Sequence, residues 1–324
     1  MLTTSERDRF ETDGFLIKEG VFSKNETTAI LDAITTMTET GIAELRRTGW
    51  RGNDHAGLPV ETRLARIHDE DPTAAETIIA GIGGRGGGGY HGPAMLTALR
   101  NARLLKIISD LVGPQIIGSS VYRVRTKLPH HPKGEVPWHQ DSGYLLPHCD
   151  RHRIITAWIP LVDANEANGC MFVVPGMHRE PILTHRTGGP AGFLIIDDER
   201  LEARRNQAVC AACPAGSVVL MTNLTPHASF TNRTKGIRWS IDLRYQGAEV
   251  PHNADQDPRD FQPTSDPVTM ACYPTEADFV LRDPIHPERE VRTAEAFAAI
   301  RAAYDRNTPK YISVRRWQAV ATTA

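Results

Sequence analysis

The sequence predicts a mainly β protein with flanking helices, whose core is a sandwich or a barrel. Between Gln115 and Gln246, short runs of β-branched and aromatic residues alternate with turns rich in Gly, Pro and Asn, which is typical of those architectures. Helical periodicity is confined to the residues before and after this region, as expected if helices cover a β core. The 324 residues contain no internal repeat and no linker. Because β domains often use ~200–250 residues, we expect a single domain over 1–324.

The residues before the β region are expected to form a helical cover over 1–112. Its predicted elements, in order, are a helix over 4–12, a strand over 15–18, a helix beginning after Ser23 and an amphipathic helix over 94–111. The first helix begins after Thr3 or Thr4 as N-cap, and Gly14 ends it. After Ser23, apolar residues recur every three to four positions, which is the helical period.

Two stretches of this cover are expected to be loops. The polar residues 49–74 have weak periodicity. Residues 81–93 contain eight glycines. No Lys-Ser or Lys-Thr follows those glycines, so a phosphate-binding loop is not indicated. A mobile lid or a surface loop is expected there instead.

The β core is expected over 115–250. Its predicted strands are Ile116–Leu128, Ile154–Val162, Cys170–Val174, Ala208–Cys210, Ser217–Met221, His227–Thr231 and Gly236–Gln246. In the C-terminal part, over 251–324, the Pro- and Asp-rich residues 251–287 are expected to loop over the core. A helix over 293–304 follows.

Charge and composition exclude several classes of protein. Lys and Arg total 37 against 39 Asp and Glu, so no basic surface indicates nucleic acid or an anionic membrane. No stretch reaches the ~18 apolar residues of a membrane span, and the first ten residues are too charged for a signal peptide. Five irregularly spaced cysteines indicate no disulfide framework, and we expect free thiols at Cys210 and Cys213. The expectation is a cytoplasmic protein.

A histidine, a carboxylate and a second histidine are candidates for a metal site. His139 and Asp141 are two residues apart, so on a strand their side chains would converge on one side. His227 follows 86 residues after Asp141, at the start of a predicted strand. Two imidazoles and one carboxylate form the facial triad that holds Fe(II) and leaves open positions. Taken singly, the first pair could be an ordinary hydrogen bond, and His227 could be structural.

The strand 236–245 alternates strictly between polar and apolar residues. Its polar members are Arg238, Ser240, Asp242 and Arg244. If the apolar face packs on helices, the arginines face a cavity and require an anion there, because an unpaired buried charge is costly. A dicarboxylate cosubstrate would fit the planar guanidinium fork. The alternative is a solvated edge strand, and whether Asp242 and Arg244 pair internally or meet substrate stays open.

Together these features resemble the Fe(II)/2-oxoglutarate-dependent oxygenases, and among them the phytanoyl-CoA dioxygenase family. The resemblance covers about residues 6–250 and includes three motifs. They are Phe10-Glu-Thr-Asp-Gly-Phe15, Pro137-Trp-His-Gln-Asp141, and Ala157–Asp163 followed by Asn168–His178. It implies a double-stranded β-helix, that is, a jelly roll with a cupin-like core.

The resemblance also implies roles for individual residues. His139, Asp141 and His227 match the iron ligands, and Arg238 matches the residue that pairs with the distal carboxylate of 2-oxoglutarate. Further matches to the cosubstrate pocket are Ser229, Gln140, Trp158 and Lys127. Related halogenases lack the carboxylate, so its presence at Asp141 favours oxygenation.

The expected function is oxidation, by hydroxylation, of an unactivated C–H bond in a small-molecule or natural-product substrate of secondary metabolism. The cofactors implied are Fe(II), 2-oxoglutarate and O₂, and the products include succinate and CO₂. No nucleic-acid or membrane partner is expected. The alternatives are a cupin-type metalloprotein, such as an isomerase or a dioxygenase without cosubstrate, and a non-catalytic ligand-binding module on the same fold.

Overall fold

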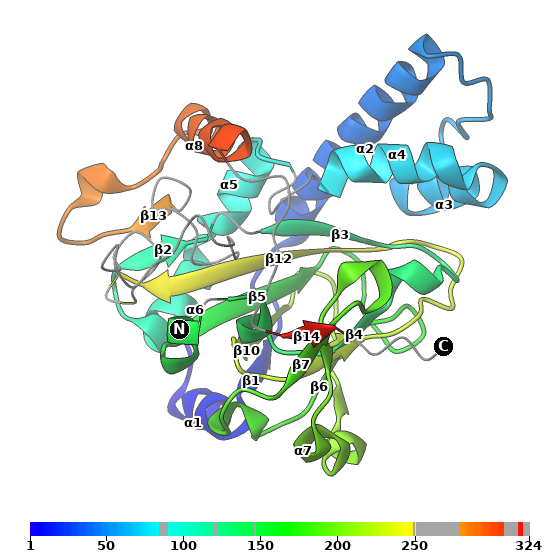
Figure 1. The fold of residues 1–324 in the computed structure, drawn as a ribbon. Helices are drawn as coiled ribbons and strands as arrows, with labels where there is room; N and C mark the ends of the chain where they lie inside the picture. The colour runs from blue at the N-terminus through cyan, green and yellow to red at the C-terminus, as the bar shows by residue number, and fades with distance from the viewer. Residues whose placement is uncertain are drawn as a thin grey trace.

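A seven-stranded antiparallel sheet contains half of the strands that the computed structural model describes. The residues that the structure describes are 1–83, 90–119, 122–145, 147–248, 250, 279–307 and 317–319. The strands of this sheet are β1 Phe15–Lys18, β2 Ile116–Gly118, β3 Arg123–Lys127, β5 Ile154–Pro160, β10 Val218–Thr222, β12 Arg238–Gly247 and β13 Phe279–Arg282. Their order is β1-β10-β5-β12-β2-β13, and β3 also pairs with β12. The long strand β12 crosses the middle of the molecule (Figure 1).

A smaller antiparallel sheet packs against the large one. Its strands are β4 Val136–His139, β6 Met171–Val173, β9 Val209–Cys210 and β11 His227–Ser229, in the order β4-β11-β6-β9. A buried apolar cluster joins the sheets, with Trp158 and Met221 from the large sheet and Met171 and Val173 from the small one. A third sheet contains β7 His185–Thr187, β8 Ile195–Ile196 and β14 Gln318–Ala319. The expected mainly β core with helices is confirmed.

Helices cover the outer face of the large sheet. They are α1 Thr4–Asp13, α2 Lys24–Arg47, α3 Val60–Glu70, α4 Pro72–Gly83, α5 Pro93–Leu99, α6 Ala102–Val112 and α8 Ala294–Asn307. The short helix α7 Glu199–Glu202 packs instead on the small sheet, where its Leu201 shares an apolar cluster with Trp138 of β4. Helices α2 to α5 and α8 lie on one side of β12 (Figure 1). As predicted, the apolar face of β12, with Ile237 just before it, joins the helices in one core cluster. That cluster extends from Leu2 to Phe297.

Local capping explains the two helices whose starts the sequence predicts. Thr3 and Ser23 are the N-caps of α1 and α2, and each forms a capping box with the glutamate three residues later. Gly14 ends α1 with a left-handed φ of 76°. A side chain at Gly14 would also collide with His178, so both backbone and packing require glycine there.

Three expectations about the elements are corrected. Residues 49–74 are not a loop, because α3 and the start of α4 lie there. Asp71 ends α3, and its side chain accepts a hydrogen bond from the Ala74 amide in the first turn of α4. The helix over 94–111 is two helices, because the Asn101 side chain caps α6. Strand β13 lies within the predicted loop 251–287. Residues 251–278 of that predicted loop lie outside the described residues. In the glycine-rich segment, residues 81–83 belong to α4, and residues 84–89 lie outside the described residues.

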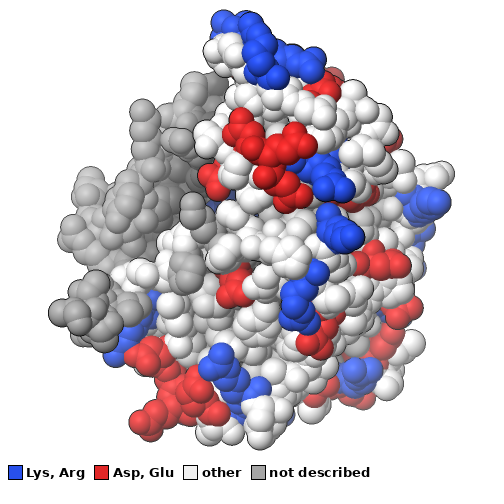
Figure 2. Space-filling view, turned by 90° about the vertical axis from the view of Figure 1, so that its right-hand side faces the viewer, with Lys and Arg blue, Asp and Glu red and all other residues white. Residues whose placement is uncertain are grey.

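Surface charge and cysteine state agree in part with the sequence. Figure 2 shows positive and negative side chains interspersed over one face of the molecule. None of the helices in the described ranges combines the length and apolar character needed to cross a bilayer. Cys210 and Cys213 are free, as predicted, and so is Cys170. Cys149, in contrast, is disulfide-bonded.

Candidate metal centre and cosubstrate pocket

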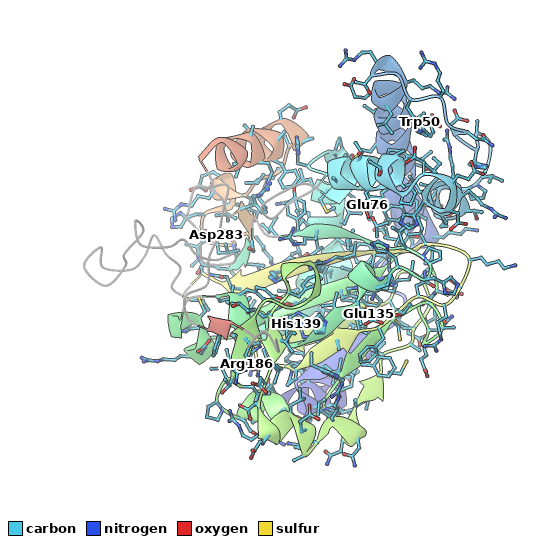
Figure 3. All side chains as sticks on the ribbon, turned by 45° about the vertical axis from the view of Figure 1, so that its right-hand side comes forward. Trp50, Glu76, Glu135, His139, Arg186 and Asp283 are labelled. Carbon is cyan, nitrogen blue, oxygen red and sulfur yellow. The ribbon has the colours of Figure 1, made fainter. Side chains whose placement is uncertain are left out.

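Pairing of two short strands brings the predicted metal ligands together. His139 ends β4 and His227 begins β11, and the two residues are register partners in this antiparallel pair. Their ring centroids are 4.2 Å apart, and His139 Nε2 lies 3.9 Å from Asp141 Oδ1. One ligand atom from each of the three residues lies within 4.8 Å of the others, and all three residues are buried. His139 lies between the β layers in Figure 3.

The His139–Asp141 pair is not entirely on a strand, as the sequence had suggested. Strand β4 ends at His139, and Asp141 begins a short 3-10 helix over Asp141–Tyr144. The residue between them, Gln140, keeps an extended backbone with φ −113° and ψ 141°. Alternation therefore continues across it, so His139 and Asp141 still face the same space.

The same alternation turns Gln140 away from the cavity. Its amide donates to the Leu224 carbonyl at 2.6 Å, and its side-chain oxygen accepts from the Leu183 amide at 2.8 Å. Gln140 is fully buried and does not line the cavity. The expectation that it lines the cosubstrate pocket is therefore wrong, because a residue between two inward-facing neighbours must point outward.

Both histidines are oriented by the backbone. The Nδ1 atom of His139 lies 2.8 Å from the Pro137 carbonyl, and Nδ1 of His227 lies 2.9 Å from the Thr225 carbonyl. A carbonyl can only accept, so Nδ1 carries the proton and each Nε2 is free to bind a metal. Burial, together with the second imidazole, lowers the pKa of His139 well below its usual value. A neutral ring is the form that binds a metal.

Asp141 is held as a carboxylate by two polar neighbours. Arg244 Nη2 donates to its Oδ1 at 3.0 Å, and the Thr156 hydroxyl donates to its Oδ2. Burial alone would raise the pKa of Asp141, but Arg244 and the two imidazoles hold it well below its usual value. The group that the metal requires is therefore charged before any metal binds.

The pairing of Arg244, which the sequence left open, is internal. Besides Asp141, Arg244 donates to Asp242 at 3.3 Å. Arg125 donates to the same carboxylate at 2.6 Å and 3.1 Å. A chain of alternating charges therefore runs from Arg125 to Asp141. The sequence indicates only that Asp242 and Arg244 share a face; it does not indicate that they lead to a metal ligand.

A cavity of about 170 Å³ contains the three candidate ligands and four of the predicted cosubstrate residues. Those four are Arg238, Ser229, Trp158 and Lys127. Apolar side chains from both sheets and one loop complete part of the wall; they are Val136, Met171, Phe193 and Met221. Further polar residues, among them Arg125, Asp242 and Arg244, also line the cavity. A cavity on which polar groups converge is typical of small-molecule sites.

Arg238 is a buried cation with no carboxylate partner among the described residues. Only 3% of it is exposed, and its guanidinium donates to Ser240 Oγ at 2.6 Å, the Gly169 carbonyl at 3.0 Å and Ser229 Oγ at 3.3 Å. Its Nε is buried without a hydrogen-bond partner, and burial lowers its pKa to about 10. Because a buried charge needs a counter-ion, this site fits the carboxylate of a bound anion.

The other three residues differ in what they can offer an anion. The Arg238 guanidinium carbon lies 5.1 Å above the Trp158 ring, which fixes the plane of the fork. The Ser229 hydroxyl already donates to Gly169 at 2.9 Å. Lys127 Nζ donates to the carbonyls of Ser229 and Phe230 at 2.8 Å and 2.7 Å. Burial, together with the charge on Arg238, lowers the pKa of Lys127 to about 6. Most of its amine is therefore uncharged at neutral pH.

Comparison with known proteins identifies the family. The model of the phytanoyl-CoA dioxygenase (PhyH) family matches residues 10–240. The peroxisomal phytanoyl-CoA dioxygenase of Bos taurus is 27% identical over 45% of this chain and 44% of its own length. The ectoine dioxygenase of Bordetella parapertussis is 26% identical over 76% of each chain.

The fold agrees with the sequence match. The structure of EctD from S. alaskensis with bound Fe has a TM-score of 0.52 and 19% identity, and it covers 77% of this chain and 78% of that chain. The chain spans about half the length of the first curated relatives it matches, 44% for the Bos taurus protein and 52% for the Caenorhabditis elegans one. Since the family model covers most of the sequence, the chain belongs to the phytanoyl-CoA dioxygenase family.

Proposed function

We propose that the protein is an Fe(II)/2-oxoglutarate-dependent dioxygenase that hydroxylates an unactivated C–H bond of a small-molecule substrate. Succinate and CO₂ are the other products. One observation carries the proposal: a buried His-Asp-His cluster shares a cavity with Arg238, a buried cation that forms no ion pair with any described carboxylate. Family membership supports it.

The donor set fits ferrous iron. His139, Asp141 and His227 would hold the ion as two neutral imidazoles and one carboxylate, which is the facial triad of non-heme iron oxygenases. When bound, the metal supplies the activation of dioxygen that attack on an unreactive C–H bond requires. Arg244 and Thr156 fix the carboxylate of Asp141, so the ligands need little reorganisation.

Arg238 would bind the distal carboxylate of 2-oxoglutarate. Its fork is held in place by Ser240, Gly169 and the face of Trp158, so binding an anion costs little side-chain entropy. The apolar residues Val136, Phe193 and Met221 line the same cavity. They would exclude water and orient the substrate toward the metal.

The two facing sheets support a double-stranded β-helix with a cupin-like core, and we propose this topology for the β region 115–250. The core cluster shared by the helices and the large sheet supports one domain over 1–324. In that domain, 1–112 is the helical cover and 251–324 is the C-terminal loop and helix.

The proposal is tested without oxygen. Fe(II) and then 2-oxoglutarate are added to the apo protein, and the visible metal-to-ligand charge-transfer band is recorded. Arg238→Ala should lower the affinity for 2-oxoglutarate by about a hundredfold, because two charge-assisted hydrogen bonds worth ~1.5 kcal/mol each are lost. The matched control is Arg233→Ala, an exposed arginine just before β12 that pairs with Glu166 on the surface.

Two alternatives predict a different result. A cupin-type enzyme without a cosubstrate, or a ligand-binding module, would bind Fe(II) at the triad but would form no such band. Unchanged affinity in Arg238→Ala would place the anion elsewhere, for example at Lys127.

A further inference from the structure

A second group of residues whose side chains can ligate a metal lies outside the candidate iron site. His68 is in the last turn of α3, Glu76 is in α4, and His131 immediately precedes the short 3-10 helix Pro132–Gly134. One ligand atom from each residue lies within 4.8 Å of the others. Figure 3 shows Glu76 in the helical layer, apart from His139 between the sheets.

The contacts of His68 point to a missing ligand. Its Nε2 atom is buried and has no hydrogen-bond partner in the described part of the chain. A buried polar atom left in this state costs about 1–3 kcal/mol, and metal coordination would remove that cost. The rings of His68 and His131 meet edge to face, with centroids 5.0 Å apart.

We propose that His68, Glu76 and His131 form a second metal site, for a divalent transition metal of the zinc type. Two imidazoles and one carboxylate are ligands that Zn²⁺ accepts, with water in the fourth position. The single negative charge of Glu76 leaves the bound ion with a net positive charge. The partial exposure of the site lets solvent or an anion compensate for it.

The site would connect the helical cover to the strand that carries an iron ligand. Its residues come from α3, α4 and the loop that leads into β4, and β4 ends at His139. Gly134, three residues after His131, lines the candidate active-site cavity. Helix α4 also contacts β3. A bound ion therefore fixes α3 and α4 to the rim of the cavity, and it should raise the melting temperature.

Metal stoichiometry tests the proposal. Full-length protein is stripped with a chelator and titrated with Zn²⁺ alone, and bound metal is counted after gel filtration. Wild type should bind two ions. The double variant His68→Gln/His131→Gln should bind one, and so should His139→Ala/His227→Ala, which keeps the second site. His130→Asn is the matched control, since it changes the adjacent histidine, and asparagine tolerates its left-handed φ of 50°. It should bind two.

One Zn²⁺ per wild-type chain that is retained in His68→Gln/His131→Gln would overturn the proposal, as would two ions in His68→Gln/His131→Gln or none in His139→Ala/His227→Ala. Glu76→Gln guards against a variant that fails to fold, because Glu76 is exposed. It should weaken the second site at least about tenfold and leave the first unchanged; equal affinities would also overturn the proposal. The anaerobic band with Fe(II) and 2-oxoglutarate should persist in His68→Gln/His131→Gln, so this proposal and the proposed function fail separately.

Discussion

Arg244 holds two buried carboxylates at once, so its replacement by methionine should destabilise the metal-free protein. The side chain of Arg244 is 10% exposed, and those of Asp141 and Asp242 are 4% and 6% exposed. Methionine keeps most of the apolar volume but removes the charge and the donors. The substitution therefore isolates the electrostatic part of the contact.

The expected loss is about 3 kcal/mol in the free energy of unfolding at pH 8. Removing one partner of a buried ion pair costs ~3–5 kcal/mol, because the other charge is left uncompensated. The lower end applies here, since Arg125 still pairs with Asp242 and Thr156 still donates to Asp141.

The loss should shrink in acid. In wild type the folded pKa of Asp141 is depressed, so the pair contributes fully above the unfolded pKa of ~3.9 and is lost only below it. Without Arg244, burial dominates and the folded pKa of Asp141 rises. Protonation then relieves the buried charge, so the difference between variant and wild type should decrease from pH 8 to pH 5.

Urea denaturation of both proteins at pH 8 and pH 5 measures this difference. Arg153→Met is the control, because it breaks an exposed pair with Glu11 and should change stability by less than about 0.5 kcal/mol. Arg244→Lys, which restores a charge, should recover part of the loss. A destabilisation that is equal at the two pH values, or absent at both, would refute the reasoning.

Three further variants follow from the structure. Lys127 has a pKa lowered to about 6, so the unfolded chain binds more protons between pH 6 and pH 10 and the free energy of unfolding should rise with pH. Lys127→Met should flatten that rise when the free energy is measured by denaturation at several pH values. An equal rise in variant and wild type would contradict the prediction. Gly14→Ala should cost at least about 1 kcal/mol, because φ is 76° and a Cβ would lie 2.3 Å from His178 Nδ1; an unchanged melting temperature would count against this. His139→Ala should abolish succinate release, measured by chromatography, and full turnover would remove His139 from the metal site.

Local signals explain which elements of the fold could be predicted from sequence. The starts of α1 and α2 were predicted because an N-cap residue, Thr3 or Thr4 for α1 and Ser23 for α2, is a local signal; the structure adds a capping box at each. Helix α3 was missed although its buried residues Val60, Leu64 and Ile67 recur at helical spacing. Helix α4 is less amphipathic than α3, and its stability comes in part from apolar contacts with the rest of the cover, such as those of Ile78. Tertiary packing of this kind overrides weak local preference.

The candidate ligands were predictable for the same reason. The spacing of His139 and Asp141 is local, and alternation assigned their side chains to one space even though the strand ends between them. Applied to Gln140, the same rule would have excluded it from the cavity. The resemblance to known proteins suggested it, and the parity of the strand opposes it.

The contact between Arg244 and Asp141 could not be predicted from the sequence, because it depends on strand register. Arg244 and Asp141 are 103 residues apart, and they meet because β12 pairs with β5 so that Arg244 lies opposite Thr156. Both side chains then face the carboxylate of Asp141. A slip of one residue would turn Arg244 into the helical core and bring Leu243 or Tyr245 to the site. Alternation alone fixes the face that Arg244 shares with Arg238, but it does not fix which residue of β5 lies opposite Arg244. The strand register therefore decides which residue pairs with Asp141. The apolar face of β12 excludes a slip of one residue, since burying Ile241 and Leu243 against the helices leaves Arg244 no other direction.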